Sequence, residues 1–172
     1  MLIDVTKLRK NTGKAFPFKL EEQWPPIEFQ GETISFLDSV IMEGTVTNTG
    51  RIILVDGTAS ASIQRACGRC LEQVTQQVNV PVSGGFIHVT EQCKDIADSV
   101  AEELTSYEGS NIDLSSQVRE ELLLSLPMRG LCREDCQGLC SNCGHNLNLG
   151  ACCCHTVHTD PRLQVLEKFF KS

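Results

Sequence analysis

Cysteines crowd the C-terminal third of this 172-residue chain. Seven of the ten cysteines fall within the 23 residues from Cys132 to Cys154. Zinc prefers four tetrahedral thiolate or imidazole ligands, and a Cys-x-x-Cys pair lets the chain turn so that both sulfurs face one ion. Cys140 and Cys143, followed by Gly144, have this spacing. The segment therefore predicts a zinc ion that stabilises the fold.

A complete site needs a second pair of ligands. The nearest candidates are Cys152 and Cys154, and we expect them to complete the first site. A further Cys-x-x-Cys lies upstream, and with two more cysteines of the C-terminal cluster it could form a second four-thiolate site: Cys67, Cys70, Cys132, Cys136. Because the last two are spaced more loosely, they could equally serve the first site. The sequence does not decide whether the chain binds one zinc ion or two.

Other residues that could bind metal or react are weaker candidates. A redox role for Cys67 and Cys70 is disfavoured, since thioredoxin-like motifs open a helix and this pair follows a strand-like stretch. Cys93 has no partner nearby, and Cys153 would point away from its neighbours in an extended segment. We interpret these two as bystanders, and we expect surface positions for three histidines: His145, His155, His158.

Catalytic motifs are absent from the sequence. It contains no glycine-rich phosphate loop, no His-Glu-x-x-His pair and no nucleophile elbow. A zinc site made only of thiolates is typically closed, whereas catalytic zinc keeps a position open for water or substrate. We therefore predict a protein that is not an enzyme and has no small-molecule substrate.

Charge is distributed unevenly along the chain. The net charge is −7, and residues 91–121 hold nine acids against two bases. Residues 1–20 carry five bases against Asp4 alone: Lys7, Arg9, Lys10, Lys14, Lys19. This basic stretch could contact phosphates, although a solvated terminal arm is the simpler interpretation and the one we favour.

The opening residues do not resemble a secretion signal, and no apolar run approaches the roughly 18–20 residues that span a bilayer. We therefore expect a cytoplasmic protein with no membrane partner. Thiols stay reduced in that compartment, which favours metal over disulfides for the cysteines.

The first two thirds of the chain favour β-strands. Residues 33–89 are rich in Val, Ile and Thr, and Asn48-Thr49-Gly50 and Asp56-Gly57 are sequences that suit hairpin turns. Residues 14–30 should run extended because Pro17, Pro25 and Pro26 interrupt them. These features predict an antiparallel sheet or a partly open barrel.

The rest of the chain should be a loop, two helices and the cysteines. Residues 90–112 are acidic and predict a mobile loop. Asp113 should cap a helix that ends at Pro127 and buries one face: Leu114, Val118, Leu122, Leu126. A short terminal helix should begin at Asp160-Pro161. We therefore predict an α+β protein, mainly antiparallel β, with a β domain at 1–112 and a helix plus a zinc-knuckle or ribbon-like module at 113–172.

Several of these motifs together resemble the YceD family, also called the large ribosomal RNA subunit accumulation protein. The resemblance rests on Cys67-x-x-Cys70-Leu-Glu, on Asp113-Leu114 with Glu121-Leu-Leu-Leu-Ser-Leu-Pro127, on the string from Cys132 to Gly144, on Asn146-Leu147-Asn148, and on Asp160-Pro-Arg-Leu163. It covers nearly the whole chain and is closest to the cysteine-rich Gram-positive form. Cys153 departs from the family pattern, so the choice of ligands among Cys152, Cys153 and Cys154 stays open.

The resemblance implies a bacterial, non-enzymatic factor for the accumulation, processing or stability of large-subunit (23S) ribosomal RNA and for large-subunit assembly. Some members of the family lack the C-terminal cysteines, which supports a stabilising role for the metal. The partner would be that RNA or a ribosomal protein. If it is RNA, four arginines near the cysteines are candidate contacts: Arg65, Arg69, Arg129, Arg133. The alternative is a zinc-stapled adaptor that binds only proteins, which the negative charge would suit.

Overall fold

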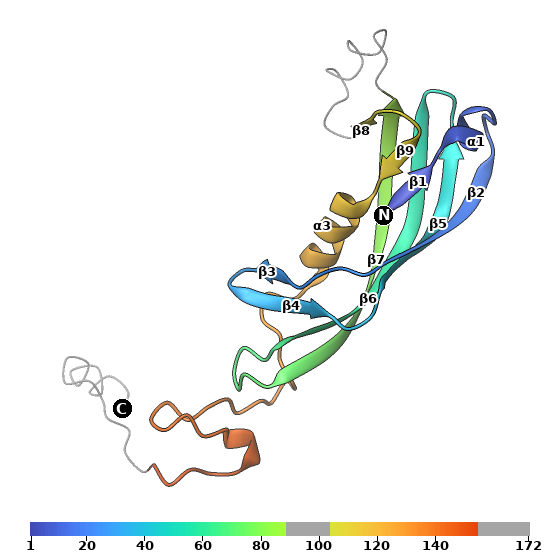
Figure 1. Cartoon of the computed structure of the whole chain (residues 1–172). Helices are drawn as coiled ribbons and strands as arrows, with labels where there is room; N and C mark the ends of the chain where they lie inside the picture. Colours follow the sequence, from blue (N-terminus) through green and yellow to red (C-terminus); the bar gives the residue numbers. More distant parts are fainter. Residues whose placement is uncertain (89–103, 155–172) are drawn as a thin grey trace, which may run out of the picture.

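The computed structural model describes residues 1–88 and 104–154 and is mainly antiparallel β-sheet (Figure 1). Its elements, in chain order, are β1 (Leu2–Asp4), α1 (Thr6–Arg9), β2 (Ala15–Glu22), β3 (Ile27–Phe29), β4 (Glu32–Phe36), β5 (Val40–Asn48), β6 (Ile52–Ala66), β7 (Gln73–His88), β8 (Leu104–Tyr107), β9 (Asn111–Asp113), α3 (Ser115–Ser125) and the 3-10 helix η2 (Leu147–Leu149). The predicted fold class is confirmed, and of its two variants the open sheet is the one formed.

The sheet is built around two long strands, β6 and β7, which curve through the molecule (Figure 1). β6 pairs antiparallel with β7 along its whole length. Along its other edge it pairs first with β5 and then, near its far end, with β4. The outer positions are held by β2 beside β5, by β3 beside β4, and by β8 parallel to β7. β1 lies apart from this sheet and pairs with β9.

The predicted hairpin at Asp56-Gly57 is wrong, because β6 runs straight through these residues. Gly57 lies opposite Gly44 of β5 in the register. A Cβ atom at Gly57 would lie 2.5 Å from the carbonyl oxygen of Glu43, and one at Gly44 would lie 2.2 Å from that of Asp56. Glycine is used here for close approach of two strands and not for a turn. The turn predicted at Asn48-Thr49-Gly50 does connect β5 to β6.

The main core lies between the sheet and the elements packed over it. Alternate residues of β6 are buried, as expected for a strand with one covered face. α3 packs against β7 and buries the predicted face, with Leu114, Val118 and Leu122 inside and Leu126 half-buried. Trp24 is buried with its ring edge-on to Phe36. The sheet and α3 therefore share one core.

The predicted acidic loop is wrong for residues 104–112, which contain β8 and most of β9. Tyr107 and Ile112 are buried there and provide the apolar contacts that anchor the short strands. The rest of that loop and the helix predicted from Asp160 lie outside the described residues. Within residues 1–88 and 104–154, no helix is long and apolar enough to cross a membrane. The division at residues 112/113 stays a prediction.

Candidate metal centre

Four cysteines from distant parts of the chain meet at one end of the long strands. Cys67 and Cys70 lie in the six-residue turn from β6 to β7, and Cys132 and Cys136 lie in the segment after α3. Their four sulfur atoms all lie within 4.8 Å of one another. We call these four residues the hairpin cluster.

The sulfur spacing in the hairpin cluster fits a shared metal ion. The Sγ atoms of Cys67 and Cys136 are 3.9 Å apart, and those of Cys70 and Cys132 are 3.6 Å apart. A disulfide would bring two sulfurs to about 2.05 Å. Four thiolates at about 2.3 Å from one tetrahedral ion lie about 3.8 Å from each other. The arrangement can hold a metal with a closed, all-sulfur shell.

Hydrogen bonds that each involve a backbone group hold the two halves of the hairpin cluster together. The backbone N–H of Gly68 donates to the carbonyl of Gly130 at 2.8 Å. The Arg69 guanidinium donates to the carbonyl of Cys136 at 2.9 Å, and the backbone N–H of Cys132 donates to the sulfur of Cys67 at 3.4 Å. Cys67, Cys70 and Cys136 are buried and form a small second core. This site therefore joins the sheet to the segment that follows α3.

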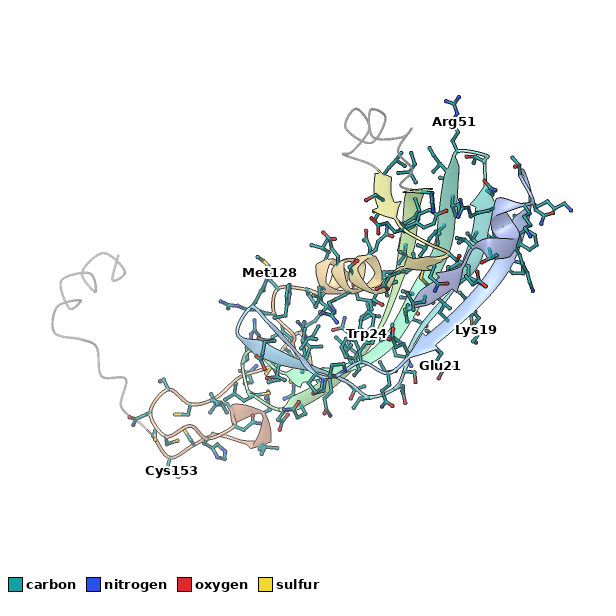
Figure 2. All side chains as sticks on the ribbon, turned by 45° about the horizontal axis from the view of Figure 1, so that its top comes forward. Lys19, Glu21, Trp24, Arg51, Met128 and Cys153 are labelled. Carbon is teal, nitrogen blue, oxygen red and sulfur yellow. The ribbon has the colours of Figure 1, made fainter. Side chains whose placement is uncertain are left out.

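The second group of cysteines is local in sequence and more exposed. Cys140, Cys143, Cys152 and Cys154 also place their sulfurs within 4.8 Å of one another, and we call them the loop cluster. Cys143 is exposed and the other three are half-buried. Cys153 is exposed and does not belong to the group; it is labelled at the edge of the molecule in Figure 2.

Each cluster contains a turn of the same form. In the hairpin cluster, the N–H of Leu71 donates to the carbonyl of Cys67, whose own N–H donates to the carbonyl of Glu72. In the loop cluster, Gly144 and Cys140 make the corresponding bonds, with the carbonyl of His145 as the last acceptor. The residue after each second cysteine has a positive φ, 64° at Leu71 and 73° at Gly144. The shared geometry follows from the shared Cys-x-x-Cys spacing.

The turns place N–H groups on the sulfur of the first cysteine. At Cys140, the N–H groups of Cys143 and Asn142 lower the pKa of the thiol to about 6. At Cys67, burial acts to raise the pKa, but N–H groups of Cys70, Arg69 and Cys132 outweigh it and lower the value to about 6. Burial raises the pKa of Cys132 to about 12. In each cluster the turn therefore favours ionisation of the first cysteine of the Cys-x-x-Cys pair.

Asn148 connects the hairpin cluster to the chain that carries the loop cluster. Its amide nitrogen donates to the sulfur of Cys136 at 3.3 Å. Its amide oxygen accepts from the backbone N–H of Gln137 and from Arg133, both at 2.8 Å. The Asn146-Leu147-Asn148 run is among the family motifs, but the sequence alone gave Asn148 no role at the cysteines. Such contacts orient a ligand and lower the charge on its sulfur.

The four candidate RNA-contact arginines differ in accessibility. Arg65 is 3% exposed and both its terminal nitrogens donate to the carbonyl of Pro127 at 3.0 Å. Arg69 bonds the Cys136 carbonyl, and Arg133 bonds Asn148. Arg129 is exposed. His145 is exposed as expected, while Cys93, His155 and His158 lie outside the described residues.

Comparison with known proteins places the chain in a family. Residues 55–170 match the model of "Large ribosomal RNA subunit accumulation protein YceD". An uncharacterised protein of Mycobacterium tuberculosis H37Rv is 26% identical over 146 residues, which cover 84% of this chain and 69% of that protein. An uncharacterised Mycobacterium leprae protein is 25% identical over 150 residues, 86% of this chain and 67% of its own length.

A maize chloroplast protein, "Large ribosomal RNA subunit accumulation protein YCED homolog 1", is 33% identical over 60 residues, which cover 35% of this chain and 20% of that protein. No solved structure matches the chain. The family match extends from near the start of β6 through both cysteine clusters and covers more than half of the sequence, so this chain belongs to the YceD family.

Proposed function

We propose that this protein is a cytoplasmic, non-enzymatic factor that supports accumulation of large-subunit ribosomal RNA and assembly of the large subunit. The observation that carries the proposal is the family match, whose description names that RNA. The steps served would be synthesis, processing or stability of the 23S RNA. The partner is that RNA or an early ribosomal protein.

Each cysteine cluster would hold one zinc ion as a structural element. The donor set supports this, because four thiolates with tetrahedral spacing suit zinc and leave no position for water or substrate. Four thiolates around a divalent ion carry a net charge of −2. Arg65, buried and separated from Cys67 by one residue, has no carboxylate partner among the residues that the structure describes. A buried cation of this kind suits an anionic metal centre nearby.

Depletion of the protein in growing cells tests the function. Large subunits and 23S RNA should fall relative to small subunits and 16S RNA, measured by sucrose-gradient sedimentation and by quantifying both RNAs. Equal levels of the two subunits after depletion would contradict the assembly role. Metal analysis of protein purified without chelator should give two zinc ions per chain, and iron in place of zinc would refute the metal assignment.

A protein adaptor without RNA contact is the second candidate, and the net charge of −7 favours it. The two candidates differ in salt dependence. Contacts to RNA phosphates release counterions and weaken steeply as salt rises, whereas contacts between proteins depend less on salt. Co-sedimentation of the tagged protein with pre-ribosomal particles at low and high salt separates them.

A further inference from the structure

The end of the molecule opposite the hairpin cluster gathers positive charge from two distant parts of the sequence. Five exposed side chains lie there, four from α1 and the turn that follows it and one from the tip between β5 and β6: Lys7, Arg9, Lys10, Lys14, Arg51. We call them the basic end. Figure 2 labels Arg51 at the tip of the sheet, far from Cys153. Sequence alone did not connect Arg51 with the N-terminal bases.

Asn48 fixes the two parts of the basic end together. It is 5% exposed, and its amide nitrogen donates to the carbonyl of Leu8 in α1 at 2.9 Å. Its amide oxygen accepts from the backbone N–H of Gly50 at 2.8 Å, and its backbone carbonyl accepts from Gly13 at 2.7 Å. A buried, fully bonded amide of this kind holds a rigid geometry. The bases are thus presented on a fixed support, which a solvated arm would not provide.

Within the part of the chain that the structure describes, no base of the basic end takes part in an ion pair. Among residues 1–88 and 104–154, the side-chain cations in ion pairs are Lys19 and Arg133, neither of them at this end. Arg9 makes a weak 3.4 Å bond to the carbonyl of Gly109. Two described acids belong to neighbouring segments: Asp4, which accepts hydrogen bonds from Thr6, and Glu108, which precedes Gly109. Neither comes within ion-pair distance of a base at this end.

At the opposite end, Arg65 is buried and both its terminal nitrogens donate to Pro127. Arg69 and Arg133 are exposed, and each donates hydrogen bonds to other residues of the protein. The two ends are separated by the length of β6. From Ile52 to Ala66 the strand spans about 45 Å at roughly 3.3 Å per residue. Charge at one end can therefore be changed without disturbing the other.

We propose that the basic end binds the phosphate backbone of RNA without reading its sequence. This inference rests on the proposed function and names the surface through which it acts. Lysine and arginine side chains on a fixed support suit phosphate contacts, which position a protein on nucleic acid. A surface that reads bases would need exposed aromatic side chains on which the bases stack. Among the described residues at this end, no large aromatic side chain is exposed.

Two matched double variants of the full-length protein test the proposal. Lys14→Gln with Arg51→Gln removes one lysine and one arginine from the basic end. Lys19→Gln with Arg119→Gln removes the same charges elsewhere, since Lys19 is exposed in the middle of β2 and Arg119 is exposed on α3, where its guanidinium lies over the Trp24 ring. Binding to a 30-nucleotide single-stranded RNA and to a 30-base-pair RNA duplex is measured from 0.05 to 1 M salt. Equal melting temperature and zinc content show that both variants fold.

The first variant should flatten the slope of log affinity against log salt by about 1.4 on single strands and 1.8 on duplex, since each phosphate contact contributes about 0.7 or 0.9. If the affinities converge at 1 M salt, the loss at 0.1 M is about 25-fold on single strands and about 60-fold on duplex. The control pair should keep the wild-type slope. Equal loss in both variants, loss in neither, or tight binding of a ribosomal protein by a wild-type protein that binds neither RNA would overturn the proposal.

The RNA-binding surface and the proposed function can be refuted independently of each other. The depletion experiment tests the role in large-subunit accumulation without reference to any surface residue. If depletion lowers large subunits while the Lys14→Gln, Arg51→Gln variant binds RNA normally, the function stands and the surface is refuted. If the variant loses RNA binding but depletion leaves both subunits equal, the surface stands and the function is refuted.

Discussion

The two cysteine clusters have the same ligands and the same turn, yet they are connected to the rest of the molecule in opposite ways. The hairpin cluster joins residues 69 positions apart and is largely buried. The loop cluster lies within residues 140–154 and is partly exposed. Closing the longer loop costs about 1.4 kcal/mol more chain entropy by the logarithmic loop-length relation. One site is therefore part of the tertiary fold, while the other organises only its own segment.

The largest effect should come from Cys67→Ser. The change replaces one ligand of the hairpin cluster by a hydroxyl in a buried position. The three remaining cysteines then lose the metal ion that balances the charge of their thiolates. We expect loss of one zinc per chain and a fall of about 10 °C in melting temperature, measured by metal analysis and thermal circular dichroism. Cys153→Ser is the control and should change neither quantity. An unchanged melting temperature in Cys67→Ser would show that this site does not hold the fold together.

A smaller loss is expected for Gly130→Ala, which tests the packing beside the hairpin cluster. A Cβ atom there would lie 2.4 Å from Nε of Arg65, whose guanidinium is buried and bonded to Pro127 and cannot easily move away. Such overpacking typically costs about 1–3 kcal/mol. Gly68→Ala is the matched control, because its Cβ would meet ordinary contacts at 3.7 Å. Chemical denaturation of both variants measures the difference, and equal stability would contradict the tight fit.

Cys143→Ser should remove one zinc but leave the sheet intact. Its cluster is local and exposed, so loss of that metal unfolds only the surrounding loop. We expect the melting temperature of the sheet to change by less than about 3 °C. In limited proteolysis, this loop should be cleaved more readily in the Cys143→Ser protein than in the Cys67→Ser protein. A fall in melting temperature as large as that of Cys67→Ser would erase the distinction between the clusters.

The smallest effects should come from exchanging the residues at the equivalent turn position. Leu71 adopts a left-handed backbone, which costs a non-glycine residue about 1–2 kcal/mol, whereas Gly144 adopts it freely. Leu71→Gly should therefore raise the zinc affinity of the hairpin cluster about twofold to fivefold, the gain being reduced by glycine's extra chain entropy. Competition with a chromophoric chelator measures this change.

Gly144→Ala is the mirror experiment and should lower the zinc affinity of the loop cluster about fivefold, since 1.4 kcal/mol is tenfold and the strain is close to 1 kcal/mol. Its Cβ would meet nothing within 4 Å, so backbone strain is the sole cause. Changes in the same direction in both variants would show that the two turns are not equivalent.

Sequence patterns were enough to predict the antiparallel sheet and the buried face of α3, because both depend on local periodicity. Val118 and Leu122 are spaced for one helical face, and β6 alternates for one covered face. The pattern failed at Asp56-Gly57, since a pair that suits a turn also suits close strand contact when another glycine lies opposite. That partner, Gly44, is identified only by the pairing of β5 with β6.

The candidate site was less accessible to sequence reasoning wherever it depends on distant contacts. Spacing alone indicated Cys140 and Cys143 as metal ligands. A second group of four cysteines exists because the turn between β6 and β7 contacts the segment after α3, and the sequence does not show that contact. Arg65 illustrates the same limit. A basic residue near cysteines suggested a phosphate contact, yet its position on the covered face of β6 places it inside.

The pairing of β1 with β9 has a consequence for the order in which the protein folds. Leu2 lies opposite Asp113, so β1 waits during synthesis for a partner that is made 111 residues later. At about 5–20 residues per second, this delay is about 5–20 s. The hairpin of β6 and β7 pairs residues from 7 positions apart, at Ala66 and Gln73, to 35 positions apart, at Ile52 and Ile87. It can form as soon as His88 has been made, and contacts of low sequence separation form fastest. Folding should therefore proceed from the middle of the chain outward.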